Sequence, residues 1–207
     1  MWLPASTTAL LRRLGALALV SLASCAANAQ VPTSGNVFFG YSYLNTTPLT
    51  SVGITSRQGL NGWEGSLEGK VFRYVGLVAD FSGNYGSQTL PIAVGTCAIG
   101  VVCSPIRVNT HIQNFLFGPR VSANFGKLRP FGEFLVGAGH VSIDMSSPPP
   151  DFVAPKDTTF ATAIGGGLDY KIIRPIAARF QADYIRTSFF GTTQNNVRLS
   201  TGIVLRF

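Results

Sequence analysis

The sequence predicts an all-β protein, an eight-stranded antiparallel up-and-down transmembrane β-barrel preceded by a cleavable signal peptide. Three observations lead to this prediction. Apolar and polar residues alternate over eight segments. The connections between these segments are long and short in turn. The few charged residues, 12% of the chain, gather on one face of the segments, whereas aromatic and aliphatic residues occupy the other.

Residues 1–29 are predicted to form the signal peptide. Arg12 and Arg13 supply its basic start, residues 14–24 form a short apolar run, and residues 27–29 supply a small-x-small cleavage site. The apolar run is shorter than the roughly 20 residues that a transmembrane helix needs. We therefore leave this segment out of the fold and treat the rest of the chain as one domain.

The three cysteines divide between the signal and the domain of residues 30–207. Cys25 lies in a Leu-Ala-Ser-Cys sequence that also resembles a lipoprotein processing box, so it is either acylated or, as we expect, removed with the signal. Cys97 and Cys103 remain, and a close pair in an exported domain predicts a disulfide that shapes an exposed loop. No histidine or acidic residue lies near this pair in sequence, so we predict no metal site and no cofactor.

Eight segments have the alternation and length of membrane strands. In chain order they are residues 37–45, 62–73, 75–85, 111–124, 130–142, 160–170, 176–187 and 196–207. Several approach the 9–11 residues of a tilted transmembrane strand. No segment with helical periodicity separates them, which favours antiparallel neighbours over parallel βαβ units.

The charged face follows the strands in order, because side chains of one parity share a face. It carries Glu64, Glu68 and Lys70 in the second strand, Asp80 in the third, Arg120 in the fourth, Glu133 in the fifth, Asp169 in the sixth, Arg179 and Asp183 in the seventh, and Arg198 and Arg206 in the eighth. The opposite face carries residues such as Trp63, Leu67, Leu77, Phe81, Ile164 and Phe180.

A soluble barrel places its charges outside and its apolar residues within. We predict the reverse, because acids and bases in near-equal number can pair inside a lumen, and because aromatic and small residues on the other face suit contact with lipid. Closure also removes the sheet edges that hydrocarbon cannot satisfy. A soluble exported β-barrel is the alternative at the level of the fold.

The connections indicate which end of the barrel is which. Those after the first, third and fifth strands are long, and those after the second, fourth and sixth (73–74, 125–129 and 171–175) are short, as is typical of membrane barrels. The short turns carry Arg73, Lys127, Arg129, Lys171 and Arg174, which either provide ordinary solubility or contact anionic phospholipid. Aromatic residues at the strand ends predict two girdles: Tyr43, Trp63, Tyr85, Phe160 and Tyr184 near the long loops, and Tyr74, Phe125, Phe131, Tyr170 and Phe207 near the short turns.

The closing strand ends the chain on an aromatic residue. Its apolar parity consists of Val197, Leu199, Ile203, Leu205 and Phe207. This pattern resembles the assembly signal of bacterial outer-membrane β-barrels, which implies the barrel assembly machinery as a partner.

The whole mature chain resembles the small eight-stranded outer-membrane β-barrels of the OmpA-like and opacity-like type, the porin-family barrel domain. The residues that carry the resemblance are 62–66 (Gly-Trp-Glu-Gly-Ser), 75–83 and the closing strand. The resemblance implies a bacterial outer-membrane location, outer-membrane lipids as partners and a monomeric barrel.

Three functions are compatible with such a barrel. The first is a structural or surface-interaction role in which paired charges close the lumen and loops bind an extracellular ligand. The second is a narrow channel for small ions or solutes. The third is a lipid A-modifying hydrolase, because His140 and Ser142 share one face of a strand and resemble the His-x-Ser of lipid A deacylases, although Ile143 follows where that family has Asn.

No basic run with interleaved aromatics is present, so nucleic acid is not a predicted partner.

Overall fold

The computed structural model describes residues 34–48, 57–90, 106–145 and 153–207. The predicted signal peptide, with Cys25, lies outside the described residues. The predicted disulfide of Cys97 and Cys103 lies outside them too.

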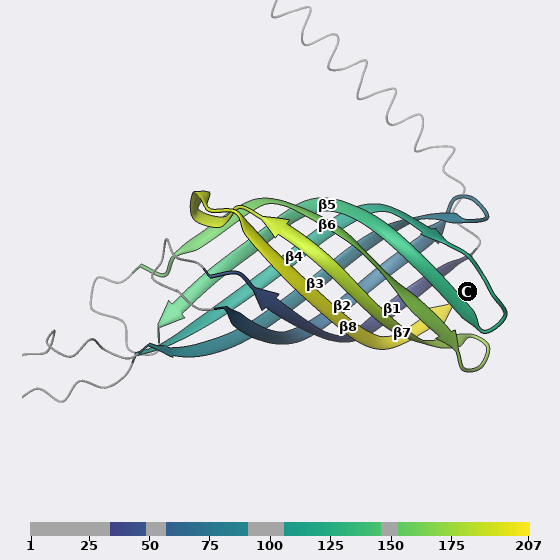
Figure 1. The fold of residues 1–207 in the computed structure, drawn as a ribbon, viewed down its shortest axis with the longest axis horizontal. Coiled ribbons are helices and arrows are strands. Elements are labelled where there is room, and N and C mark those ends of the chain that lie inside the picture. The colour runs from purple at the N-terminus through teal and green to yellow at the C-terminus, as the bar shows by residue number, and fades with distance from the viewer. Residues whose placement is uncertain (1–33, 49–56, 91–105, 146–152) are drawn as a thin grey trace, which may run out of the picture. The chain divides into compact units, whose positions relative to one another are not determined.

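The described residues form a closed antiparallel barrel in which each strand pairs with its neighbours in the chain, as predicted. The strands are β1 (Gly35–Thr46), β2 (Gln58–Lys70), β3 (Val75–Leu90), β4 (Ile106–Ser122), β5 (Leu128–Met145), β6 (Lys156–Lys171), β7 (Ile176–Thr187) and β8 (Gln194–Arg206). The barrel closes where β8 pairs with β1, with Leu205 opposite Val37. The strands wind round the barrel at a slant (Figure 1), the tilt that closure of a sheet requires.

Several strands extend further into the long connections than alternation predicts. β3 continues to Leu90 and pairs with β4 from Ile106, whereas the pattern indicates residues 85 and 111 as the ends. The added residues of β3 include Ser87, Gln88 and Thr89, which are polar on both faces. Alternation therefore disappears although the backbone pairing continues, so the strands predicted from alternation are too short at this end.

Backbone hydrogen bonds within the short turns set where the adjoining strands end. β2 ends at Lys70 rather than at residue 73, because the N–H groups of Val71 and Phe72 both donate to the carbonyl of Val75. The β4–β5 turn contains Gly126, whose φ of 63° suits a residue without Cβ. These tight reversals keep neighbouring strands in register at this end of the barrel.

The outer face is apolar along every strand. Large hydrophobic side chains are exposed in regular alternation with buried positions, for example Phe39 and Tyr41 on β1 and Phe180 and Tyr184 on β7. Phe134 on β5 follows the same pattern. Such a surface suits contact with lipid. No helix among the described residues has the length and hydropathy to cross a membrane.

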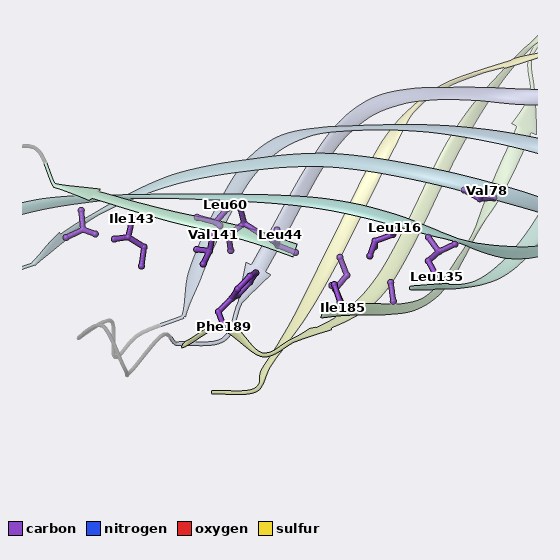
Figure 2. Close-up of a cluster of buried hydrophobic side chains, with 13 residues drawn as sticks. Leu44, Leu60, Val78, Leu116, Leu135, Val141, Ile143, Ile185 and Phe189 are labelled. Carbon is purple, nitrogen blue, oxygen red and sulfur yellow. The ribbon is translucent and has the colours of Figure 1, made fainter. Parts of the chain in front are cut away.

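The interior has two zones. Charged side chains occupy the half nearer the short turns and the middle of the barrel. Toward the long connections, buried apolar side chains lie among buried polar ones such as Ser42, Thr110 and Gln194. The apolar cluster there consists of Leu44, Leu60, Val108, Ile112, Leu116, Leu135, Val141, Ile143, Ala161, Ala163, Ile185 and Phe189, and its remaining member, Val78, lies nearer the short turns, opposite Glu68. Figure 2 shows side chains of this cluster reaching inward from several strands, with Phe189 from the short helix η2 (Phe189–Gly191) among them.

Candidate functional site: the charged interior

The first ion-pair cluster lies near the short turns and centres on Asp169 of β6. Arg179 of β7 donates through Nε to Oδ1 of Asp169 at 2.7 Å, and Nη1 of Arg129 lies 3.3 Å from Oδ2 of the same carboxylate. Arg129 also donates to Glu68 of β2, on another side of the barrel. All four side chains are buried, so the cluster ties β2, β5, β6 and β7 together across the lumen.

Arg120 of β4 extends this cluster. Its Nη1 lies 3.2 Å from Oε2 of Glu68, and its Nε donates to Oε2 of Glu133 on the adjacent β5 at 2.7 Å. Arg120 and Glu133 are partners in the β-sheet register, so their pairing follows from strand alignment. The contact of Arg120 with Glu68 crosses the interior and depends on closure of the barrel.

The second cluster surrounds Arg198 of β8 in the middle of the barrel. Its Nη1 lies 2.8 Å from Oδ1 of Asp80, its Nη2 lies 2.8 Å from Oδ2 of Asp183, and its Nε lies 3.3 Å from Oε2 of Glu64. One guanidinium thus holds three buried carboxylates, in the fork geometry that suits arginine. Gln181 joins the clusters, because its amide donates to Glu64, Asp183 and Glu133 at 2.9–3.1 Å.

Aromatic rings separate the arginines near the short turns. The guanidinium of Arg120 lies 4.3 Å from the centre of the Phe131 ring, and that of Arg179 lies 4.5 Å from the same ring. Arg179 is also 5.0 Å from the ring of Phe38. Cations over aromatic faces are attracted by the ring quadrupole, and the attraction is strongest when both groups are desolvated. The stack keeps like charges apart inside the barrel.

The placement of Phe131 corrects the predicted girdle at the short-turn end. Its ring is only 7% exposed and points inward, whereas Tyr74, Phe125, Tyr170 and Phe207 are exposed. Gly167 makes room for it, since a Cβ there would lie 2.7 Å from Cζ of Phe131. Gly165 of the same glycine run leaves room on the other side in the same way, for the carboxylate of Asp183 on β7.

The interior also contains an arginine that the sequence pattern assigns elsewhere. The pattern places Arg129 in a short turn, but β5 begins at Leu128, and Arg129 is 2% exposed inside the barrel. Its parity matches that of Glu133, which is the signal that could have identified it. The turn interpretation is wrong because the turn itself is tighter, with the Phe125 and Leu128 backbones bonded to each other.

The eleven charged residues of the predicted face do not all lie equally deep. Nine are buried, and the two nearest the short-turn rim, Lys70 and Arg206, are partly exposed. Arg206 reaches Asp169 with a long contact of 3.5 Å. Lys70 interacts electrostatically with Arg129, Glu68 and Arg206. Positive charge therefore accumulates toward the short-turn mouth, while the middle cluster has three carboxylates for one arginine.

The candidate catalytic pair lies elsewhere, on the outer face of β5 toward the long connections. His140 and Ser142 are both partly exposed there. Nδ1 of His140 lies 2.7 Å from the hydroxyl of Thr158 on β6. Ser142 is opposite His111 on β4 and Lys156 on β6 in the register. Among the described residues no group of three or more His, Cys, Asp or Glu is arranged to hold a metal.

The residues of the predicted assembly signal all face outward on the closing strand. Val197, Leu199, Ile203, Leu205 and Phe207 are 41–63% exposed, and they alternate with the buried Arg198, Ser200 and Val204. β8 is held by β7 on one side and β1 on the other. This strand therefore seals the barrel.

Comparisons with solved structures identify the architecture. Ail, the attachment invasion locus protein of Yersinia pestis, in complex with the heparin analogue sucrose octasulfate, is similar with a TM-score of 0.55 and 15% identity, over 84% of this chain and 98% of that chain. Neisserial surface protein A is similar with a TM-score of 0.57 and 8% identity, over 84% and 97%. The chain has the fold of the small outer-membrane β-barrels.

A third structure agrees with this fold. OprG, an outer-membrane protein of Pseudomonas aeruginosa, is similar with a TM-score of 0.52 and 8% identity, over 86% of this chain and 97% of that chain. No protein-family model and no curated protein matches the sequence. At these identities the likeness establishes the fold of an eight-stranded barrel and no more than the fold.

Proposed function

We propose that the protein is a bacterial outer-membrane β-barrel with a closed lumen, which anchors its long connections at the cell surface for interaction with an external ligand. The apolar outer band and the fold support the membrane location. The interior supports the closed lumen. The observation that carries the proposal is that two buried ion-pair clusters and a buried apolar cluster together fill one barrel.

A conducting pore needs a continuous water-accessible path. An eight-stranded barrel is just wide enough for side chains to fill its interior. Here Arg198, Asp80 and Glu64 are fully buried in the middle, and Leu135 and Ile185 are equally buried above them. Charges that hold one another across the lumen act as crosslinks between strands, and apolar side chains above them oppose entry of hydrated ions. We therefore assign the charges a structural role.

Single-channel conductance of the mature chain, refolded into a planar bilayer, tests this assignment. Heat-dependent migration on an unboiled gel first shows that the barrel has folded. We expect a silent bilayer. Discrete and reproducible openings would overturn the closed lumen and support the alternative of a narrow channel for small ions or solutes.

The long-loop rim favours an anionic surface ligand. Arg57, Lys156 and Arg186 are exposed at this end of β2, β6 and β7. Ail, which has the same fold, was solved with a polyanionic heparin analogue. We expect the mature protein to bind heparin in a salt-dependent manner, and a variant with all three residues changed to Gln to bind more weakly. Equal retention of both proteins on a heparin column would exclude this ligand class.

Biogenesis follows from the same proposal. The signal peptide of residues 1–29 directs export, and mass spectrometry of the mature protein is expected to find Gln30 at its N-terminus. A lipidated Cys25 would contradict this. We further propose that the outward residues of β8 are recognised by the barrel assembly machinery and that the folded barrel is a monomer, because paired strands leave no edge among the described residues.

A further inference from the structure

A hollow of about 390 Å³ opens at the short-turn end of the barrel. It lies among the β4–β5 turn, the β6–β7 turn and the end of β8. Its lining includes Asn124, Lys171, Ile173, Arg174, Arg206 and Phe207. Two backbone hydrogen bonds hold its walls together: the N–H of Lys171 donates to the carbonyl of Lys127, and that of Arg206 donates to the carbonyl of Pro175.

Three cationic side chains meet at this hollow, and no aspartate or glutamate lines it. Arg206 has one ion-pair partner in the described part of the chain, Asp169, at a long 3.5 Å. That carboxylate already binds Arg129 and Arg179 more closely. The buried Nε of Arg206 has no hydrogen-bond acceptor among the described residues. The hollow therefore has three cations in its lining and no carboxylate to neutralise them, and an anion bound there would supply that charge.

Apolar side chains surround the same hollow on the outside. Ile173 and Phe207 line it and are 58% and 63% exposed, and Ile172 beside them is also exposed. Exposed aliphatic and aromatic residues at the end of a membrane barrel suit the boundary between headgroups and acyl chains. An anion that brings its own apolar chains fits both features.

We propose that this hollow binds the phosphate of an anionic glycerophospholipid of the inner leaflet, with Lys171, Arg174 and Arg206 as its ligands. The proposal rests on the outer-membrane placement given above. The acyl chains would lie against Ile173 and Phe207, and the amide of Asn124 supplies a further polar group for the headgroup. The site thus gives the short-turn end a specific lipid contact in addition to diffuse attraction between basic turns and a charged leaflet.

Arg73 offers a matched control. It is an exposed arginine in another short turn, but it lies outside the hollow and packs over the ring of Tyr74 at 5.3 Å. Lys171 and Arg174 sit at the rim and belong to neither of the two ion-pair clusters of the interior, so changing them to Gln leaves the interior intact. Arg73→Gln removes the same kind of charge from the same end of the barrel.

The test is native mass spectrometry of the folded mature protein released from detergent with equal amounts of phosphatidylglycerol and phosphatidylcholine. We expect one phosphatidylglycerol to be retained preferentially. Lys171→Gln with Arg174→Gln should weaken this retention roughly tenfold or more, and Arg73→Gln should leave it unchanged. Equal retention of both lipids, or equal losses in the two variants, would overturn the proposal.

A second arm separates lipid from free phosphate. Inorganic phosphate and the deacylated headgroup glycerophosphoglycerol are added as competitors. If the competitors displace the lipid only when their concentration is far above that of the lipid, the site recognises the acylated ligand. Displacement at comparable concentrations would overturn the lipid assignment and leave a simple phosphate site. Both experiments use protein whose folding is verified by gel migration. Their results therefore do not depend on whether the lumen conducts ions.

Discussion

The guanidinium of Arg179 lies 4.5 Å from the centre of the Phe131 ring, and the two side chains come from β7 and β5, which are not neighbours in the sheet. Arg120 covers the same ring at 4.3 Å. Both arginines also have carboxylate partners, so one aromatic ring links two ion pairs. Charge neutralisation and packing therefore act at the same place inside the barrel.

Replacing Phe131 should be costly. Phe131→Ala removes a buried ring and two cation–ring contacts, and we expect a loss of about 3–5 kcal/mol in the free energy of unfolding. Urea unfolding of the protein folded in lipid vesicles, followed by tryptophan fluorescence, measures it. Phe134→Ala is the matched control, because Phe134 lies three residues further along β5, on the opposite face of the strand. Its side chain is 51% exposed on the outside of the barrel. Similar losses in both variants would show that the ring stack has no special role.

Arg198 should be the most sensitive charge in the middle cluster. Arg198→Ala leaves Glu64, Asp80 and Asp183 buried without their common cation, and removal of one partner from a buried pair typically costs about 3–5 kcal/mol. The same unfolding measurement is compared with Arg186→Ala, which removes an exposed arginine from the outer face of β7 and should change stability by less than about 0.5 kcal/mol. An Arg198→Ala protein with unaltered resistance to urea would contradict the network.

Gly167 should not accept a side chain. A Cβ there would lie 2.3 Å from the carbonyl oxygen of Phe180 and 2.7 Å from Cζ of Phe131, so Gly167→Ala must displace backbone or ring and should destabilise the barrel by about 1–3 kcal/mol. Gly132→Ala serves as the control, since the nearest atom to its added Cβ is 3.8 Å away. The prediction fails if the two alanine variants unfold at the same urea concentration.

Catalysis by the outer face of β5 is not expected. Nδ1 of His140 contacts the hydroxyl of Thr158 at 2.7 Å, an ordinary cross-strand interaction between residues that are partners in the register. Mass spectrometry of lipid A from cells that express the protein should therefore detect no deacylated product. If such a product does form and disappears in His140→Ala, the hydrolase alternative with Ser142 as nucleophile becomes the better assignment.

Cys97 and Cys103 are predicted to form a disulfide in the exported protein, a prediction that stands outside the described residues. Alkylation of the unfolded protein should modify neither cysteine without a reductant and both after reduction. Modification without reductant would show free thiols and remove the constraint from this loop.

The amino-acid pattern by itself determines the strands and their faces. β7 shows this most clearly, because its observed bounds, Ile176–Thr187, equal the predicted ones and its inward residues include the expected Arg179 and Asp183. The physical reason is local: successive side chains of a strand point to opposite faces, so parity alone separates them. The pattern is weaker in β4 and β5, where Leu116, Ile112 and Val141 make both faces apolar, and the apolar zone of the interior cannot be predicted there.

Partners and depth are decided only by the tertiary structure. Parity places Arg198 and Asp80 each on the inward face of its own strand, but the two residues lie 118 positions apart in the chain. Only closure of the barrel brings Nη1 of Arg198 to 2.8 Å from Oδ1 of Asp80. The same holds for Arg129, which a shorter turn carries into the lumen beside Asp169. Strand tilt and register set the height of each side chain, and both are properties of the closed sheet rather than of any single strand. Parity along a strand thus determines which residues share a face, and the fold determines where each strand begins and which inward residues meet.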